Sequence, residues 1–223
     1  MNLAIDRAVE VKIVLEVRKT DNITMRLWLE TIENVVGSNG LKSILNYAQL
    51  KQFIDSYPPD NDDQDIPLED LRKFYLALHD LFGQKGARSL QLRVGREFIR
   101  IGTEKRPTIA KALKLSTRLV PENKRIRMAL QKYADIYDER QPSLIYKPRI
   151  EVKEEDEYFL LIDKDNFESE GISSDTPICN TCVGRLQYTM EWITGHPHHI
   201  EEIECRAMGH PFDVFRISKA PQE

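Results

Sequence analysis

Residues 177–184 read Pro177-Ile-Cys179-Asn-Thr-Cys182-Val-Gly184, and residues 201–209 read Glu201-Glu-Ile-Glu-Cys205-Arg-Ala-Met-Gly209. Apolar residues recur at helical spacing from about Pro177 to Thr194, and a glycine follows at once. Such a pattern predicts a helix that ends at this glycine. Two cysteines therefore lie at the start of a helix, and a Glu-x-x-Cys segment follows the helix, so this stretch decides the fold of the C-terminal half.

The residues around this helix predict a small antiparallel sheet. Two alternating runs, residues 198–206 and 212–218, follow the helix and predict a β-hairpin. Upstream, residues 144–146 and 157–162 are short apolar and aromatic runs that predict two more strands.

The N-terminal half contains an internal echo. Gly37-Ser-Asn-Gly40 is followed 46 residues later by Gly83-Gln-Lys-Gly86, and an amphipathic helical pattern precedes each copy. Each copy predicts a helix, a glycine cap and a second helix, which together form a duplicated helical hairpin. The whole chain is therefore predicted to be α+β, with a helical N-terminal half and a small antiparallel sheet packed on helices in the C-terminal half. We expect residues 1–60 to form an N-terminal helical segment and residues 61–223 the main domain.

Composition limits the classes of protein. The net charge is −4, and the three cysteines favour reduced thiols or metal ligands over a disulfide scaffold. No apolar run reaches the roughly 20 residues of a membrane-spanning helix. Charged residues interrupt the N-terminal stretch where a signal peptide would be apolar, so we expect a cytoplasmic protein.

The order of cysteine, glycine, helix, glycine, Glu-x-x-Cys and Ala-x-Gly in residues 178–218 resembles the 4-vinyl reductase domain family. The resemblance covers about 40 residues. It implies a fold related to haem-based nitric-oxide-binding domains. It also implies a link to chlorophyll metabolism and photosynthesis, or to the binding of hydrocarbons and aromatic molecules.

The same resemblance implies a structural zinc site. Its ligands would be Cys179, Glu202, Cys205 and Asp213, with aspartate in place of the family's last cysteine. Cys182 could substitute as a ligand through the Cys-x-x-Cys pair. Glu202 and Cys205 would point to opposite sides of a regular strand, so both can reach one metal only if the strand bulges. The alternative interpretation is three reduced core thiols without metal.

Other residues carry weaker signals. Residues 196–199 read His-Pro-His-His and could bind metal, but a solvated turn after the helix is the simpler interpretation. Tyr188 and Trp192 lie on the helix face opposite the cysteines, where they could line a ligand cavity or pack against another helix or subunit. Residues 104–132 carry a local charge of +7, from nine Lys or Arg and two Glu. This stretch could dock a homodimer or a protein partner, and without a DNA-binding motif we expect no nucleic acid.

These observations predict a non-catalytic binding module for a hydrophobic or aromatic small molecule. A tetrapyrrole, such as a chlorophyll or bilin precursor, is the first choice of ligand because of the resemblance. The first alternative is a vinyl reductase or reductase subunit, although the chain has no glycine-rich cofactor motif and no recognisable catalytic set. The second alternative is a protein-interaction scaffold.

Overall fold

The computed structural model describes residues 18–222, except 106, 109, 110, 112, 113, 116–118 and 142. The chain divides into two compact units between Val94 and Gly95. The boundary expected after residue 60 lies inside the first unit. None of the helices among the described residues has the length and the apolar character needed to cross a membrane.

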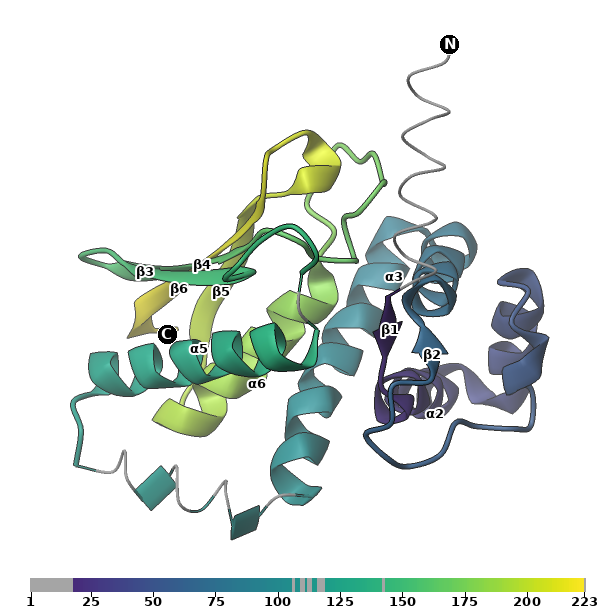
Figure 1. Cartoon of the computed structure of the whole chain (residues 1–223), viewed down its shortest axis with the longest axis horizontal. Helices are drawn as coiled ribbons and strands as arrows, with labels where there is room; N and C mark the ends of the chain where they lie inside the picture. The colour runs from purple at the N-terminus through teal and green to yellow at the C-terminus, as the bar shows by residue number, and fades with distance from the viewer. Residues whose placement is uncertain are drawn as a thin grey trace. The chain divides into compact units, whose positions relative to one another are not determined.

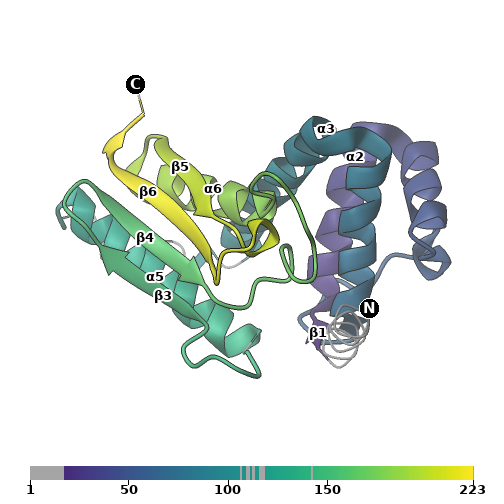
Figure 2. The same cartoon turned by 90° about the horizontal axis from the view of Figure 1, so that it is seen from above.

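The first unit is built mainly from two long helices. They are α2 (Asn22–Tyr47) and α3 (Leu68–Lys105), of which α3 continues into the second unit. The 3-10 turn η1 (Lys51–Phe53) lies between them in the chain, and β1 (Lys19–Thr20) pairs with β2 (Ile66–Pro67). Helices α2 and α3 lie side by side (Figure 2). Trp28 of α2 is fully buried and packs edge-on against Phe74 and Tyr75 of α3, with ring centroids 6.0 and 6.1 Å apart.

The duplicated glycine turn is confirmed in both long helices. Gly37 has φ 75° inside α2, and Gly83 has φ 64° inside α3, so each interrupts the helix in a conformation that favours glycine. Three residues later the two copies again behave alike. A Cβ on Gly40 would lie 2.9 Å from Cβ of Val36, and a Cβ on Gly86 would lie 2.9 Å from Cβ of Phe82. The two copies of the repeat therefore form the same helix–turn–helix geometry, in which glycine is needed at the same two positions.

The second unit contains a four-stranded antiparallel sheet, which confirms the predicted α+β class. The strands are β3 (Ile150–Glu154), β4 (Tyr158–Asp163), β5 (His198–Glu204) and β6 (Asp213–Pro221), and their order in the sheet is β3-β4-β6-β5. Helices α5 (Glu122–Arg140) and α6 (Asn180–Thr194) lie along one face of the sheet (Figures 1 and 2). The turn η2 (Arg206–Met208) connects β5 to β6.

Two of the local predictions need comment. Residues 144–146 do not form a strand, because Oγ of Ser143 accepts hydrogen bonds from the backbone N–H groups of Ile145 and Tyr146 and holds them in a turn. The pairing with β4 is made by β3 instead. The sequence of residues 107–119 also predicts a short helix, but seven of these thirteen residues lie outside the described part of the chain.

Candidate functional site

Four acidic and thiol side chains come together at the end of the sheet in the second unit. They are Cys179, Glu202, Cys205 and Asp213, each of which offers one ligand atom within 4.8 Å of the others. Sγ of Cys179 lies 4.0 Å from Sγ of Cys205, so the two thiols are close but not bonded. These are the four positions that the resemblance implied, and we call them the thiol–carboxylate cluster.

Three elements position the cluster. Cys179 precedes the first turn of α6, Cys205 follows β5, and Asp213 is the first residue of β6. A register shift in the pairing of β5 with β6 lies between Glu202 and Glu204. Such an irregularity changes the alternation of side chains along a strand, so Glu202 and Cys205 can face the same point.

Cys182 lies apart from the cluster. Its Sγ is 3.6 Å from Oη of Tyr133 on α5, and it is not among the grouped ligand atoms. Helix α6 begins at Asn180, so Cys179 has non-helical dihedral angles (φ −75°, ψ 54°) and does not share a helix face with Cys182. The Cys-x-x-Cys spacing therefore does not bring the two thiols to one point.

The two carboxylates of the cluster are held mostly by backbone groups. Oε2 of Glu202 accepts a hydrogen bond from N–H of Cys179 at 2.8 Å, and Asp213 accepts from N–H of Arg206 at 2.7 Å and from Oγ of Ser169 at 2.5 Å. Oε1 of Glu202 is buried and has no hydrogen-bond partner in the described part of the chain. Among the described residues, neither carboxylate forms an ion pair with Lys, Arg or His.

Burial shapes the protonation of this cluster. It raises the pKa of Glu202 to about 8, that of Asp213 to about 7, and that of the Cys179 thiol well above its usual value. The hydrogen bond from Cys179 lowers the pKa of Cys205 to about 7. With no basic partner among the described residues, the ionised forms of these buried carboxyls are costly unless a cation binds.

Glu168 is a buried acid that the sequence analysis missed. It accepts hydrogen bonds from the N–H groups of Thr181 and Cys182, at 2.9 and 3.1 Å, and so caps the N-terminus of α6. Burial raises the pKa of Glu168 to about 7. The capping residue lies 12 positions before the helix, so no local capping pattern could have identified it.

This cap should make stability depend on pH. In the folded state the pKa of Glu168 is about 7, so this side chain keeps its proton up to about pH 7, whereas a glutamate in the unfolded chain has a pKa near 4.5. The free energy of unfolding should therefore fall as pH rises from about 4.5 to 7, by at least about 1.4 kcal/mol, the equivalent of one pKa unit. Urea unfolding of the chelator-treated protein across this range measures the slope. The slope should become smaller in Glu168→Gln and stay unchanged in Glu155→Gln, which alters an exposed carboxyl. Equal slopes in all three proteins would contradict this role of Glu168.

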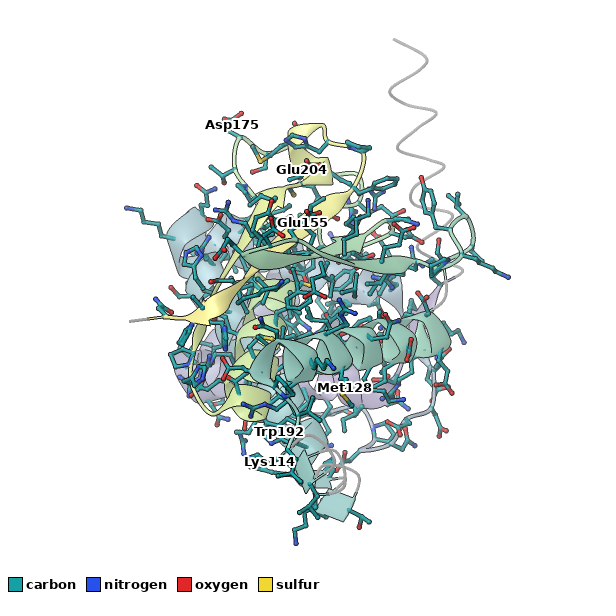
Figure 3. The ribbon with its side chains drawn as sticks, turned by 90° about the vertical axis from the view of Figure 1, so that its left-hand side faces the viewer. Lys114, Met128, Glu155, Asp175, Trp192 and Glu204 are labelled. Carbon is teal, nitrogen blue, oxygen red and sulfur yellow. The ribbon has the colours of Figure 1, made fainter. Side chains whose placement is uncertain are left out.

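A cavity of about 830 Å³ lies beside the C-terminal end of α6, in the second unit. Its lining includes Tyr188 and Trp192, the two aromatic residues considered as ligand contacts, together with Lys111, Lys114 and Arg125. Nζ of Lys114 lies 5.4 Å from the centroid of the Trp192 ring (Figure 3). Part of the basic stretch 104–132 thus faces a cavity. Docking of a homodimer or protein partner on this stretch stays a prediction.

Arg125 has an unpaired donor in this lining. Its Nη1 donates to the carbonyl oxygen of Ile193 at 3.2 Å, and its Nη2 lies 3.4 Å from Oε2 of Glu122. Its Nε is buried and has no hydrogen-bond partner among the described residues.

Residues 196–199 were predicted to form a solvated turn, and this is confirmed for only part of the segment. His199 is exposed, but His198 is buried, and burial lowers the pKa of His198. Nδ1 of His198 lies 2.9 Å from the carbonyl oxygen of Ser218. This ring is therefore held in place by the sheet instead of moving in solvent.

Comparison with solved structures identifies the fold. An Fe(II) unliganded H-NOX protein from K. algicida covers 91% of this chain and 97% of its own, with 12% identity and a TM-score of 0.60. A structure from a study of heme distortion in the H-NOX family covers the same shares, with 15% identity and a TM-score of 0.58. The chain has the H-NOX fold. Neither a protein-family model nor a curated protein sequence matches it.

The assignment to the 4-vinyl reductase family is therefore wrong, and the links to chlorophyll biosynthesis and photosynthesis fall with it. The quoted motif folds into α6 and the β5–β6 hairpin, elements that belong to an architecture covering almost the whole of an H-NOX chain. A 40-residue order of cysteines and glycines was too short to separate the two families. The zinc that this resemblance implied gains no support from the H-NOX structures, so any metal must be argued from the donor atoms themselves.

Heme is the group whose distortion was studied in one of these H-NOX structures, and it needs a protein ligand for its iron. Heme iron in proteins is held by His, Cys, Met or Tyr. Among the described lining residues, Tyr188 is the only one of these types. This cavity therefore does not fit a heme held by histidine, cysteine or methionine, although its cations suit the carboxylates of a tetrapyrrole.

Proposed function

We propose that this chain is a non-catalytic binding module for an aromatic small molecule that carries carboxylates. The cavity beside α6 is the binding site in this proposal. The observation that carries it is the lining itself, in which three cationic side chains and the rings of Tyr188 and Trp192 surround one cavity.

The lining combines two kinds of contact. Tyr188 and Trp192 offer ring faces and edges for an aromatic ligand, which such residues favour through stacking and T-shaped contacts. Lys111, Lys114 and Arg125 offer three cations for carboxylates. The volume of about 830 Å³ is within the range of small-molecule sites, roughly 300–1,000 Å³.

A tetrapyrrole belongs to this ligand class, because it combines an aromatic macrocycle with carboxylates. The cations and aromatic rings of the lining support a tetrapyrrole as ligand. This proposal includes no role in photosynthesis. A smaller aromatic carboxylate satisfies the same contacts. The two sizes of ligand are therefore compared directly in the binding experiment.

Fluorescence titration with protoporphyrin IX and with 2-naphthoate tests the site. Trp28→Phe removes the other tryptophan, so that quenching reports on Trp192. We expect quenching by at least one probe and an affinity at least tenfold lower in Lys114→Ala, a loss of about 1.4 kcal/mol. Lys124→Ala is the matched control, because this exposed lysine belongs to the same basic stretch but not to the lining. No quenching by either probe, or equal affinities in the two lysine variants, would reject the site.

We also propose that the thiol–carboxylate cluster binds a divalent transition-metal ion with a structural role. Two thiols and two carboxylates form a complete four-donor set, and all four lie within 4.8 Å of one another. The buried, unpartnered Oε1 of Glu202 and the lack of a cationic partner among the described residues support a cation at this point. A full set of protein ligands leaves no position for chemistry, which agrees with a non-catalytic module.

Metal content and stability test this cluster. Elemental analysis of the purified protein should find one metal per chain at this site, and Co²⁺ substitution should give a thiolate-to-metal charge-transfer band. Both should be lost in Cys205→Ser and kept in Cys182→Ser, since Cys182 lies apart. Free metal at 100 times the dissociation constant should stabilise the protein by about 2.7 kcal/mol over the chelated form. Equal metal contents in wild type and Cys205→Ser would refute the site.

A further inference from the structure

A second group of metal-ligand side chains lies apart from the thiol–carboxylate cluster. It consists of Glu122, His196 and His198, whose ligand atoms all lie within 4.8 Å of one another. Glu122 is the first residue of α5, His196 follows α6, and His198 begins β5. The start of α5 and the segment between α6 and β5, 74 residues apart in the sequence, thus converge on one point of the second unit.

The distances within this group suit a shared ion. Nε2 of His196 lies 3.0 Å from Oε2 of Glu122, and Nε2 of His198 lies 3.9 Å from Oε1 of the same carboxylate. Ligand atoms about 2.0–2.1 Å from a tetrahedral metal are about 3.4 Å from each other. The observed separations lie on either side of this value, so small side-chain rotations are enough to close the site.

His198 is oriented as a ligand. Its Nδ1 lies 2.9 Å from the carbonyl oxygen of Ser218, and since a carbonyl can only accept, this nitrogen carries the proton. Nε2 then presents a lone pair toward Glu122, and its other neighbour is Oγ1 of Thr194 at 3.2 Å. A histidine whose second nitrogen donates to a backbone carbonyl is the arrangement found in metal sites, where it sets the tautomer and the ring orientation.

Glu122 is also supported from outside the group. Nη2 of Arg125 lies 3.4 Å from its Oε2, and ligating carboxylates are commonly hydrogen-bonded in this way. Arg125 and Thr194 both belong to the lining of the cavity as well. The group therefore lies next to residues of the cavity lining without being part of it. It is partly open to solvent, since the side chains of Glu122 and His196 are 29% and 34% exposed.

We propose that Glu122, His196 and His198 bind a divalent transition-metal ion such as Co²⁺, Ni²⁺ or Zn²⁺. Two imidazoles and one carboxylate suit these borderline ions, and three protein ligands leave at least one coordination position open. The site differs in kind from the thiol–carboxylate cluster, because it lacks sulfur, is partly exposed and can exchange a ligand. An ion pair between Glu122 and a protonated His196, with no metal, is the competing account.

Titration of the full chain with Co²⁺ decides between the two accounts. Cys205→Ser serves as the background, so that any cobalt bound without a thiolate charge-transfer band belongs to the second site. We expect one equivalent of such cobalt, with an affinity at least tenfold lower in Glu122→Gln and in His196→Gln. His199→Gln is the matched control, because His199 is an exposed histidine of the same segment outside the group.

The substituted residues are chosen so that loss of cobalt binding can be distinguished from loss of folding. Glu122 and His196 are half-exposed, and circular dichroism establishes that their variants fold, whereas a change at the buried His198 could disturb the sheet. The proposal is overturned if the Cys205→Ser background takes up no cobalt, or if His196→Gln and His199→Gln bind it equally. Neither result depends on whether the thiol–carboxylate cluster binds metal or the cavity binds an aromatic carboxylate.

Discussion

Asp163→Asn should lower the free energy of unfolding by about 3–5 kcal/mol, the usual cost of breaking a buried ion pair. Arg149 and Asp163 meet through two hydrogen bonds, Nε to Oδ1 at 2.9 Å and Nη2 to Oδ2 at 2.8 Å. The side chains are 2% and 5% exposed. The substitution preserves volume but leaves the buried Arg149 guanidinium without its ion-pair partner. Urea unfolding of the variant and the wild type gives the difference.

Two further variants identify the cause of this loss. Glu201→Gln removes an ion pair with Arg216 in which both side chains are more than a third exposed, so it should cost at most about 1 kcal/mol. The double variant Arg149→Met/Asp163→Leu replaces the buried pair by apolar side chains and should recover most of the stability. If Asp163→Asn lowers the free energy of unfolding no more than Glu201→Gln does, the buried ion pair stabilises the fold no more than an exposed one.

Gly95→Ala should destabilise the second unit by about 3 kcal/mol, near the upper end of overpacking effects. A Cβ at this position of α3 would lie 2.2 Å from the carbonyl oxygen of Thr181 and 2.8 Å from the backbone nitrogen of Arg185, both in α6. Backbone atoms of a helix cannot rotate away as a side chain can, so the two helices must separate. Thermal unfolding with a probe in the second unit, such as Trp192 fluorescence, measures the effect.

Gly102→Ala is the matched control for this helix contact. It lies in the same helix, and an added Cβ would meet nothing within 4 Å. Because alanine favours the helix more than glycine does, this variant should gain about 0.5–1 kcal/mol. If the two variants change the free energy of unfolding by similar amounts, the close contact between α3 and α6 does not require glycine at position 95.

Local sequence signals predicted most of the architecture. The helix before Gly195, the hairpin that follows it and the two glycine turns are each set by periodicity and capping within one segment. The structure shows all of them, with α6 ending at Thr194 and positive φ angles at Gly37 and Gly83. The strand predicted over residues 144–146 failed for a local reason too, because the Ser143 hydroxyl competes for the backbone N–H groups that pairing would use.

The sites depended more on distance in space than on spacing in the sequence. The resemblance implied the positions of Cys179, Glu202, Cys205 and Asp213, and the need for a bulge near Glu202 followed from the period of a strand. The spacing of the cysteines did not show whether Cys182 belongs to the same cluster. Cys182 is only three residues from Cys179, yet it lies against Tyr133 on another helix.

By itself, the sequence determined the α+β class and the helix–glycine–helix repeats, because each follows from residue patterns within single elements. The four residues of the thiol–carboxylate cluster were named through a family resemblance, and only the tertiary structure brings them to one point. Only the tertiary structure decided the H-NOX fold, the cap from Glu168 and the meeting of Glu122 with His196 and His198. The cavity beside Trp192 was also decided only by the tertiary structure. Each of these needs segments far apart in the chain to pack together, and packing depends on the shapes of all the surfaces in contact, which no short pattern of residues contains.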